Sequence, residues 1–470
     1  ASAIQEFDGA SIYVPGWSDD EGTPYTASAY TFTNTDITLT NGRLLADMNA
    51  NENKTTIDGT TYYNIDTPKK LQWFAYYVNT ANAEPYKTAS ARLTANIDLA
   101  TVCGANVNGT EISWTPIAQK TLYAYDNGWT GIFDGNRKKI SGLYINKPEE
   151  TNQGLFGYVQ GNIKNLTVQG QVNGLSNVGL LASLIGINAT VEHCTTEGAV
   201  SGEQSVGGVV GMVRFSTSRI SYCANHASVT GSTSYRVGGI AGSTSGTVSH
   251  SVNYGAITGT RTDFDDSTVG GIAGIKEGSG GDIENCANLG NVSCSHGNVG
   301  GIVGHLFYGS LSNCLNAGTV TSNTDNAAAH SVVGGNNNQT VTNCYYISGE
   351  DLLTDPLATA KTAEELASGV VARLLNGGNG MAELPTGAWG QNTSSDYIPQ
   401  LGGAAVYCLT LGTDKHYGNS GMEVPIPAEV PEFVGSRIYT GGYFDSEGNP
   451  YTASAYTFTN EDFALTAGKL

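Results

Sequence analysis

The side chains best suited to chemistry in this 470-residue sequence are eight cysteines, five of which hold matching positions in a repeated phrase. These five are Cys194, Cys223, Cys286, Cys314 and Cys344. If successive phrases stack as neighbouring strands, the thiols lie about 4.8 Å apart, a spacing that disulfides permit. Leu166 and Ser251 hold the same position in two other phrases. A column of buried structural side chains is therefore the favoured interpretation, with disulfides and a metal site as weaker alternatives.

A second column, one position before the cysteines, holds ring and amide side chains. Its members are Asn165, His193, Tyr222, His250, Asn285, Asn313 and Asn343. A metal ion needs several converging ligands, but His193 and His250 are two repeats apart, about 10 Å in a stack of strands. We therefore expect a solvated or corner ladder here and no metal site.

Carboxylates within the repeats are too widely spaced for glycoside hydrolysis. Glu192 and Glu284 share one column but lie three repeats apart, about 14 Å in a stack. The two carboxyl groups of a glycosidase are about 5–9.5 Å apart. The repeats also contain few arginines and lysines that could hold an acidic sugar for a lyase. The sequence therefore predicts no catalytic residues, and its binding residues stay unknown.

Acidic side chains outside the columns offer weak calcium sites, because calcium takes carboxylate oxygens as ligands. One expected loop contains Asp263, Asp265 and Asp266. Two related turn sequences supply the other candidates, which are Asp19 and Glu21 near the start and Asp445 and Glu447 near the end. Solvated turns are the default interpretation of such clusters. No cofactor is therefore expected, with calcium as the weak exception.

Short repeated strands must position these columns. The phrase Val-Gly-Gly-aliphatic-x-Gly begins at Val206, Val237, Val269 and Val299, and partial copies precede and follow these. An asparagine column follows the cysteines, at Asn225, Asn253, Asn288 and Asn316. Asparagine tolerates left-handed corners, and its amide can bond the amide one repeat away. We therefore expect an asparagine ladder along the stack.

The runs of valine, isoleucine and glycine are too short and too β-branched for helices, and they indicate about three strands per repeat. Parallel stacking lets each strand gain a neighbour while identical aliphatic side chains bury a continuous core. The predicted fold class is an all-β, right-handed parallel β-helix with short helical caps and flanking β-segments.

The repeated phrase, its spacing and the preceding Trp129-Thr-Gly-Ile-Phe-Asp-Gly-Asn136 segment resemble the GLUG-motif repeat proteins of bacterial cell surfaces. The resemblance covers roughly residues 62 to 402. It implies a secreted or surface-displayed β-helix of adhesin type and supplies no catalytic residues. Some members of that family join such repeats to secreted metallopeptidases, but this sequence has no H-E-x-x-H motif, so that activity is not implied.

The expected organisation has three parts: a β-segment over 1–60, the GLUG-type β-helix over 61–402, and a β-segment over 403–470 that is related to 11–44. Two α-helices are predicted, near 67–79 and 362–376, where they would cover the two open ends of the β-helix. Residues 24–34 and 450–460 are identical at an offset of 426. They are either two related hairpins or the start of a unit that recurs end to end, in one longer chain or between copies of the protein.

The charge balance argues against two classes of binding partner. Twenty-two lysines and arginines against 42 aspartates and glutamates give a net charge of −20. This argues against nucleic acid and anionic membrane surfaces, and no apolar run is long enough to span a bilayer. The first residues lack the features of a signal peptide. We expect a non-catalytic adhesin or fibre subunit at a bacterial surface that binds host or cell-surface glycans or proteins; the alternative is a secreted glycan-binding or glycan-degrading β-helix.

Overall fold

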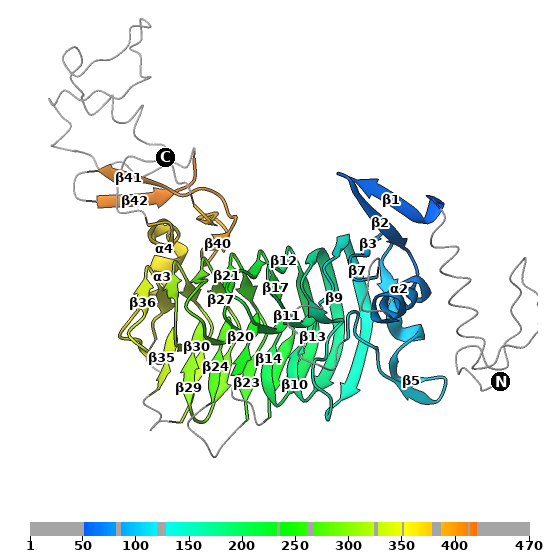
Figure 1. Ribbon diagram of the computed structural model, residues 1–470. Coiled ribbons are helices and arrows are strands. Elements are labelled where there is room, and N and C mark those ends of the chain that lie inside the picture. The colour runs from blue at the N-terminus through cyan, green and yellow to red at the C-terminus, as the bar shows by residue number, and fades with distance from the viewer. Residues whose placement is uncertain are drawn as a thin grey trace, which may run out of the picture.

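The computed structural model describes residues 51–80, 86–119, 128–232, 236–260, 267–323, 328–349, 352–377, 387–411 and 414–420. In this part of the chain, successive coils stack along one axis as a parallel β-solenoid (Figure 1). The predicted all-β parallel fold class is confirmed. The two identical segments, 24–34 and 450–460, lie outside the described residues, so the end-to-end unit stays a prediction.

Three parallel sheets form the walls of the solenoid, as expected from three strands per repeat. One sheet orders β8 (Phe156–Val159), β11 (Ala182–Ile185), β15 (Val210–Val213), β20 (Ala241–Thr244), β25 (Ala273–Lys276), β30 (Val303–Leu306) and β35 (Val333–Asn336). The second orders β10 (Ser176–Gly179), β14 (Gln204–Gly207), β19 (Arg236–Gly238), β24 (Thr268–Gly270), β29 (Asn298–Gly300) and β34 (Ala329–His330).

The largest sheet begins with an antiparallel pair and is otherwise parallel. Its first strands are β1 (Lys54–Ile57), β2 (Thr60–Ile65), β3 (Ser90–Leu93), β4 (Ile97–Asp98), β7 (Ile132–Lys147), β9 (Asn162–Gly174), β12 (Thr190–Glu192) and β13 (Thr195–Gly202). The middle strands are β16 (Arg219–Ser221), β17 (Ala224–Asn225), β18 (Ser228–Gly231), β21 (Thr247–Ser249), β22 (Val252–Asn253) and β23 (Ile257–Gly259). The last are β26 (Ile283–Glu284), β27 (Ala287–Asn288), β28 (Val292–Cys294), β31 (Ser310–Ser312), β32 (Leu315–Asn316), β33 (Val320–Thr321), β36 (Thr340–Thr342), β37 (Tyr345–Ile347) and β38 (Thr359–Lys361).

The remaining elements lie outside these sheets. Three antiparallel pairs are β5 (Gly104–Val107) with β6 (Thr110–Ile112), β39 (Trp389–Gly390) with β40 (Gln400–Leu401), and β41 (Tyr407–Leu411) with β42 (Asp414–Gly418). Two 3-10 turns, η1 (Asn51–Asn53) and η2 (Leu99–Thr101), precede β1 and β5. Parallel pairing thus runs from β2 to β38, and the predicted boundary at residue 402 falls after the antiparallel β39–β40 pair.

The repeated phrase places identical side chains in register. Val206 pairs with Val237, and the same position continues through Val269 and Val299. All four valines are fully buried. Complete burial of such a side chain stabilises the fold by about 1.5–3 kcal/mol, so each added coil extends the core and supports its neighbours.

Helix α2 (Pro68–Thr80) covers the N-terminal end of the core, as predicted (Figure 1). The Thr67 hydroxyl accepts a hydrogen bond from the Lys70 amide at 3.2 Å, which caps the first turn. Leu71 and Phe74 are fully buried, and the Phe74 ring lies edge-on to Trp129 with centroids 6.4 Å apart. The apolar face of the helix therefore closes this end of the stack.

The prediction of a single capping helix near 362–376 is wrong in two respects. Two short helices, α3 (Ala363–Ala367) and α4 (Val370–Leu375), replace one, because Gly369 between them adopts φ 88°. The capping box formed by Thr362 and Glu365 is present. The two helices also lie on the outside of the solenoid and do not close its end: α3, α4 and Trp389 pack on apolar side chains that point outward from β27, β32 and β37. This cluster contains Ala287, Leu315, Tyr345, Leu366, Val371, Leu375 and Trp389.

The C-terminal end of the stack is closed by the chain around Asp355. In the preceding coil, the amides of Ile302 and Val303 both donate to the Val332 carbonyl oxygen at 3.0 Å. In the last coil, the amides of Val332 and Val333 donate instead to Asp355 Oδ2, at 2.9 and 2.7 Å. The Asp355 carboxylate therefore takes the place of the carbonyl that a further coil would supply.

Candidate functional site

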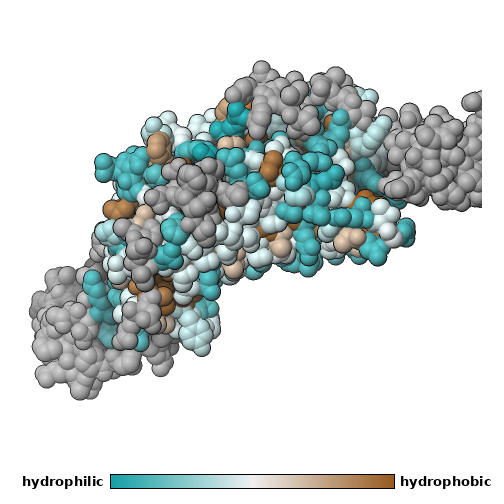
Figure 2. Space-filling view, turned by 90° about the horizontal axis from the view of Figure 1, so that it is seen from below, coloured by the Kyte–Doolittle hydropathy of each residue, from teal (hydrophilic) through white to brown (hydrophobic). Residues whose placement is uncertain are grey.

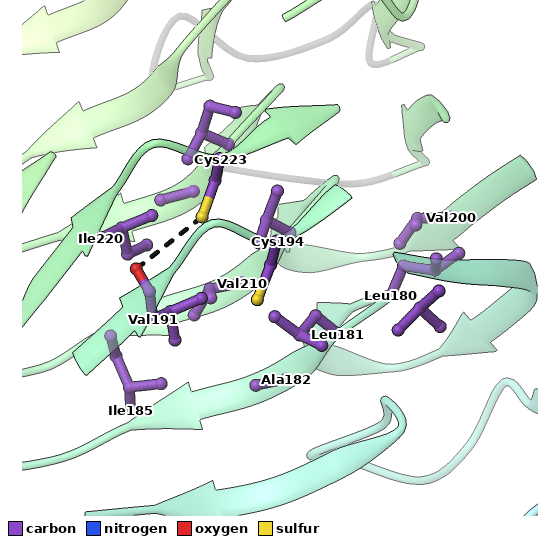
Figure 3. Packing of buried hydrophobic residues seen from close by; sticks show 14 of the residues in the cluster. Leu180, Leu181, Ala182, Ile185, Val191, Cys194, Val200, Val210, Ile220 and Cys223 are labelled. Carbon is purple, nitrogen blue, oxygen red and sulfur yellow. Dashed lines mark hydrogen bonds between the residues drawn. The ribbon is translucent and has the colours of Figure 1, made fainter. Parts of the chain in front are cut away.

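The five cysteines of the predicted column are buried and carry free thiols. Each Sγ donates to the carbonyl oxygen two residues earlier at 3.2–3.3 Å. Figure 3 shows Cys194 and Cys223 among leucine, isoleucine and valine side chains, with the bond from Cys223 Sγ to the Val191 oxygen, 3.7 Å long, dashed. Burial raises the pKa of Cys194 and Cys314. These thiols pack the core and are protected from reaction.

Thiol labelling tests this arrangement. We expect an aromatic disulfide reagent to label Cys408 quickly in the native protein, because Cys408 is partly exposed while the other seven cysteines are buried. In denaturant without reductant, all eight thiols should react. Cys408→Ser is the control, and it should remove the fast phase alone. A count below eight in denaturant would restore the disulfide alternative.

The asparagine column forms the predicted ladder. Asn225 Nδ2 donates to Asn253 Oδ1 at 2.8 Å, and the same bond links Asn253 to Asn288 at 2.7 Å and Asn288 to Asn316 at 2.8 Å. Thr196 donates to the first amide of the row at 2.9 Å. These amides are buried, so their mutual bonds satisfy groups that water cannot reach.

The expected left-handed corners are not at the ladder asparagines but three positions before them. The column of rings and amides has φ between 49° and 55° in all seven members, which are Asn165, His193, Tyr222, His250, Asn285, Asn313 and Asn343. Asparagine enters this region at low cost, and the rings of His193, Tyr222 and His250 stack with centroids 4.8 and 4.7 Å apart. The prediction of a corner ladder is confirmed.

The second glycine of the repeated phrase is required by the ladder. A Cβ atom on Gly239 would overlap the carbonyl oxygen of Gly271 and the side-chain amide of Asn253. The equivalent glycines of the other coils face the ladder in the same way; they are Gly208, Gly271 and Gly301. The repeated glycine and the repeated asparagine are therefore two halves of one packing contact, and their joint recurrence in the sequence signals it.

Lys276 is a buried cation whose structural role was not predicted from the sequence. It lies in register with Thr244 and Leu306 and is fully buried. Its Nζ donates to the carbonyl oxygens of Gly278 and Gly280 at 2.9 and 3.1 Å. Burial lowers its pKa from 10.5 to about 8. The ammonium therefore bridges the carbonyl groups of the turn that follows β25, and these bonds offset only part of the cost of burying its charge.

The depressed pKa of Lys276 predicts a pH effect on stability. The unfolded chain keeps the ordinary pKa of 10.5, so it binds more protons than the folded chain between pH 8 and 10.5. The free energy of unfolding should therefore rise with pH across this window, by about 2–3 kcal/mol from this group. Urea unfolding of the wild type and Lys276→Met at several pH values measures the difference, with Leu306→Met as the control. Parallel curves for the wild type and Lys276→Met would contradict the prediction.

A polar groove lies beside the N-terminal coils. It has a volume of about 910 Å³, and its lining includes Glu111, Trp114, Asn146, Glu150 and Gln153. Glu111 Oε1 accepts hydrogen bonds from Asn146 Nδ2 and Tyr144 Oη, both at 2.8 Å. These bonds, the one from Asn146 first, lower the pKa of Glu111, so the carboxylate stays ionised at neutral pH. Sequence reasoning missed this groove because its residues occur once and outside the repeats.

The calcium candidates lie outside the described residues; they are Asp19, Glu21, Asp263, Asp265, Asp266, Asp445 and Glu447. Calcium binding there stays a prediction. Within the described ranges, no group of three or more histidine, cysteine, aspartate or glutamate side chains is placed to hold a metal ion. None of the helices in the described part of the chain is both long and apolar enough to cross a membrane.

The fold and its ladders define the class: this is a parallel β-solenoid protein. No family model matches the sequence. Halomucin from Haloquadratum walsbyi is 29% identical over 188 residues, which is 38% of this chain and 2% of halomucin. The chain thus spans about 2% of the curated relative that it matches. The crystal structure of a proposed immunoglobulin A1 protease from Bacteroides ovatus superposes with a TM-score of 0.46 at 20% identity, covering 74% of this chain and 94% of that one.

Proposed function

We propose that this protein is a non-catalytic, extracellular surface protein of adhesin type, in which the solenoid is a stiff rod that presents its outer faces to a partner. The observation that carries the proposal is the hydrogen bonding of the most reactive side chains in the coils. The five thiols of the cysteine column, the ladder amides and the Lys276 ammonium bond within their own coil or to a neighbouring coil. These groups therefore hold the rod together.

The surface and the sequence support this role. The face shown in Figure 2 is mostly hydrophilic, with apolar residues at scattered positions. The resemblance of the repeats to GLUG-motif proteins of bacterial surfaces and the partial match to halomucin support a surface location. Membership of the GLUG group and end-to-end association of copies belong to the same proposal.

Glycan degradation is the second candidate, because the polar groove contains two carboxylates. Glu150 Oε1 is in an ion pair with Lys147 at 2.9 Å, and hydrogen bonds keep Glu111 ionised. A glycosidase needs one protonated carboxyl group as its general acid. The groove is therefore better suited to holding a glycan than to cleaving one.

Three measurements test the proposed function. Antibody labelling of intact producing cells should give a surface signal that external protease removes, and labelling only after permeabilisation would overturn the location. Electron microscopy of the native, unheated protein should show rods, and filaments with a constant axial repeat would support association of copies. Release of reducing ends from a polysaccharide panel would overturn the non-catalytic role.

A further inference from the structure

We infer that the polar groove is a binding site for a neutral or amino-sugar glycan, whose chain continues along a row of hydroxyl and amide side chains on the outer face of the rod. This inference deepens the proposed function and rests on it. It names the class of ligand and the place where the ligand binds.

Glu111 is the anchor of the groove. Its Oε1 atom is fixed by Tyr144 and Asn146 at 2.8 Å, while within the described part of the chain Oε2 accepts no hydrogen bond. An ionised carboxylate with one free oxygen accepts hydrogen bonds from sugar hydroxyls or from a sugar ammonium. The two protein donors hold the carboxylate in one orientation, so little side-chain entropy is lost when a ligand binds.

The other walls of the groove supply one ion pair and two fixed side chains. The Lys147–Glu150 ion pair offers a donor and an acceptor at the rim. Gln153, which is 1% exposed, and Trp114, which is 5% exposed, are held by bonds to backbone carbonyl oxygens, from Gln153 Nε2 to Thr151 and from Trp114 Nε1 to Leu155. The open surface of the groove is mostly polar, which suits a ligand rich in hydroxyl groups, and its volume falls within the range of small-ligand sites.

A polar row leads out of the groove along the stack. Asn146, Asn173 and Ser201 pair in register, and the row continues on the same face through Thr230, Thr258, Ser293 and Thr321. Asn173 donates to Asn146 and Ser201 donates to Asn173, each at 3.0 Å. Each coil thus presents one neutral hydroxyl or amide, about 4.8 Å from the next. Regular polar groups at this spacing suit an extended chain of sugars.

Charge selects the class of glycan. The row contains no ionisable side chain, Glu111 is ionised, and the whole protein carries a net charge of −20. A polyanionic glycan would be repelled from this face, whereas a neutral or amino-sugar chain would not. The inference therefore excludes acidic polysaccharides as the ligand.

Isothermal titration calorimetry on the full chain tests the site. The probes are chitobiose, chitohexaose, laminarihexaose and xylohexaose, with oligogalacturonate as the anionic comparator. We expect at least one of the neutral or amino-sugar hexasaccharides to bind and oligogalacturonate not to bind. Glu111→Gln should weaken binding at least tenfold, because it removes the charged acceptor. Glu192→Gln, which changes a carboxylate on another face of the rod, should leave binding unchanged.

The row makes a separate prediction about ligand length. Asn173→Ala should weaken hexasaccharide binding several-fold and leave disaccharide binding unchanged, since only the longer probe reaches the row. Binding of none of these sugars, preference for oligogalacturonate, or equal affinity of the wild type and Glu111→Gln would overturn the inference. If intact cells are labelled at the surface but the titration is negative, the glycan site is overturned and the proposed function is retained. Absence of surface labelling would instead overturn the proposed function, whatever the titration gave.

Discussion

Replacing Asp355 with alanine should destabilise the last coils by about 3 kcal/mol, because hydrogen bonds from two buried amides to a charged acceptor are lost together. The Val332 and Val333 amides donate to Asp355 Oδ2 at 2.9 and 2.7 Å, and the Leu357 amide donates to Oδ1 at 2.8 Å. Asp355 is only 5% exposed, so water cannot easily replace it. Urea unfolding and hydrogen exchange at Val332 and Val333 measure the effect.

A matched pair of variants separates the carboxylate from general effects of substitution. Asp355→Asn keeps the size and one acceptor oxygen, and it should cost less than Asp355→Ala. Glu52→Ala, at an exposed acid near the other end, should change the free energy of unfolding by less than about 0.5 kcal/mol. Unchanged exchange at Val332 and Val333 in Asp355→Ala would show that the carboxylate does not close this end.

Features that recur in every coil could be predicted from the sequence. The buried valine column, the cysteine column and the asparagine ladder each repeat in register. The same residue type therefore recurs wherever the surroundings are the same, and the sequence shows the pattern several times. A left-handed φ is expected from the sequence in both columns that contain asparagine, because residue type alone does not separate a corner from a ladder, and only the ring and amide column has it. Backbone geometry places the corner at Asn285 and the ladder at Asn288.

Features that occur once could not be predicted. Asp355 closes the stack from a segment that resembles no repeat, and its role depends on where the last coil ends. The apolar residues of α3 and α4 have the spacing expected of a capping helix. They pack instead on the outward-facing side chains of Leu315 and Tyr345, on the side of the rod. The groove at Glu111 likewise depends on contact between the β5–β6 hairpin and the end of β7, which are brought together only by the fold.

Asn253→Ala should cost about 4 kcal/mol, because its side chain makes four hydrogen bonds inside the buried ladder. Asn253 Nδ2 donates to the Gly255 carbonyl at 2.9 Å and to Asn288 Oδ1 at 2.7 Å. Its Oδ1 accepts from Asn225 at 2.8 Å and from the Gly255 amide at 3.2 Å. Alanine removes these four hydrogen bonds and leaves a void against the neighbouring coil. The Asn225 amide keeps its bond to the Ala227 carbonyl at 2.9 Å, and the Gly255 amide keeps its bond to the Asn225 carbonyl at 3.2 Å, so the loss falls mainly on the Gly255 carbonyl and on Asn288 Oδ1. Urea unfolding followed by far-UV circular dichroism measures the loss.

Two further substitutions show whether the ladder acts through its hydrogen bonds. Asn316→Ala, at the end of the row, loses one bond fewer and should cost about 1 kcal/mol less. Asn253→Asp keeps the shape but replaces both donors with a carboxylate in a dry column, so its pKa should be raised above the unfolded value of about 3.9. Its stability should then be highest below that value and fall as pH rises through the folded pKa. If Asn253→Asp were as stable as the wild type at neutral pH, shape alone would hold the coils in register. If it recovers stability in acid, the amide donors are what joins one coil to the next.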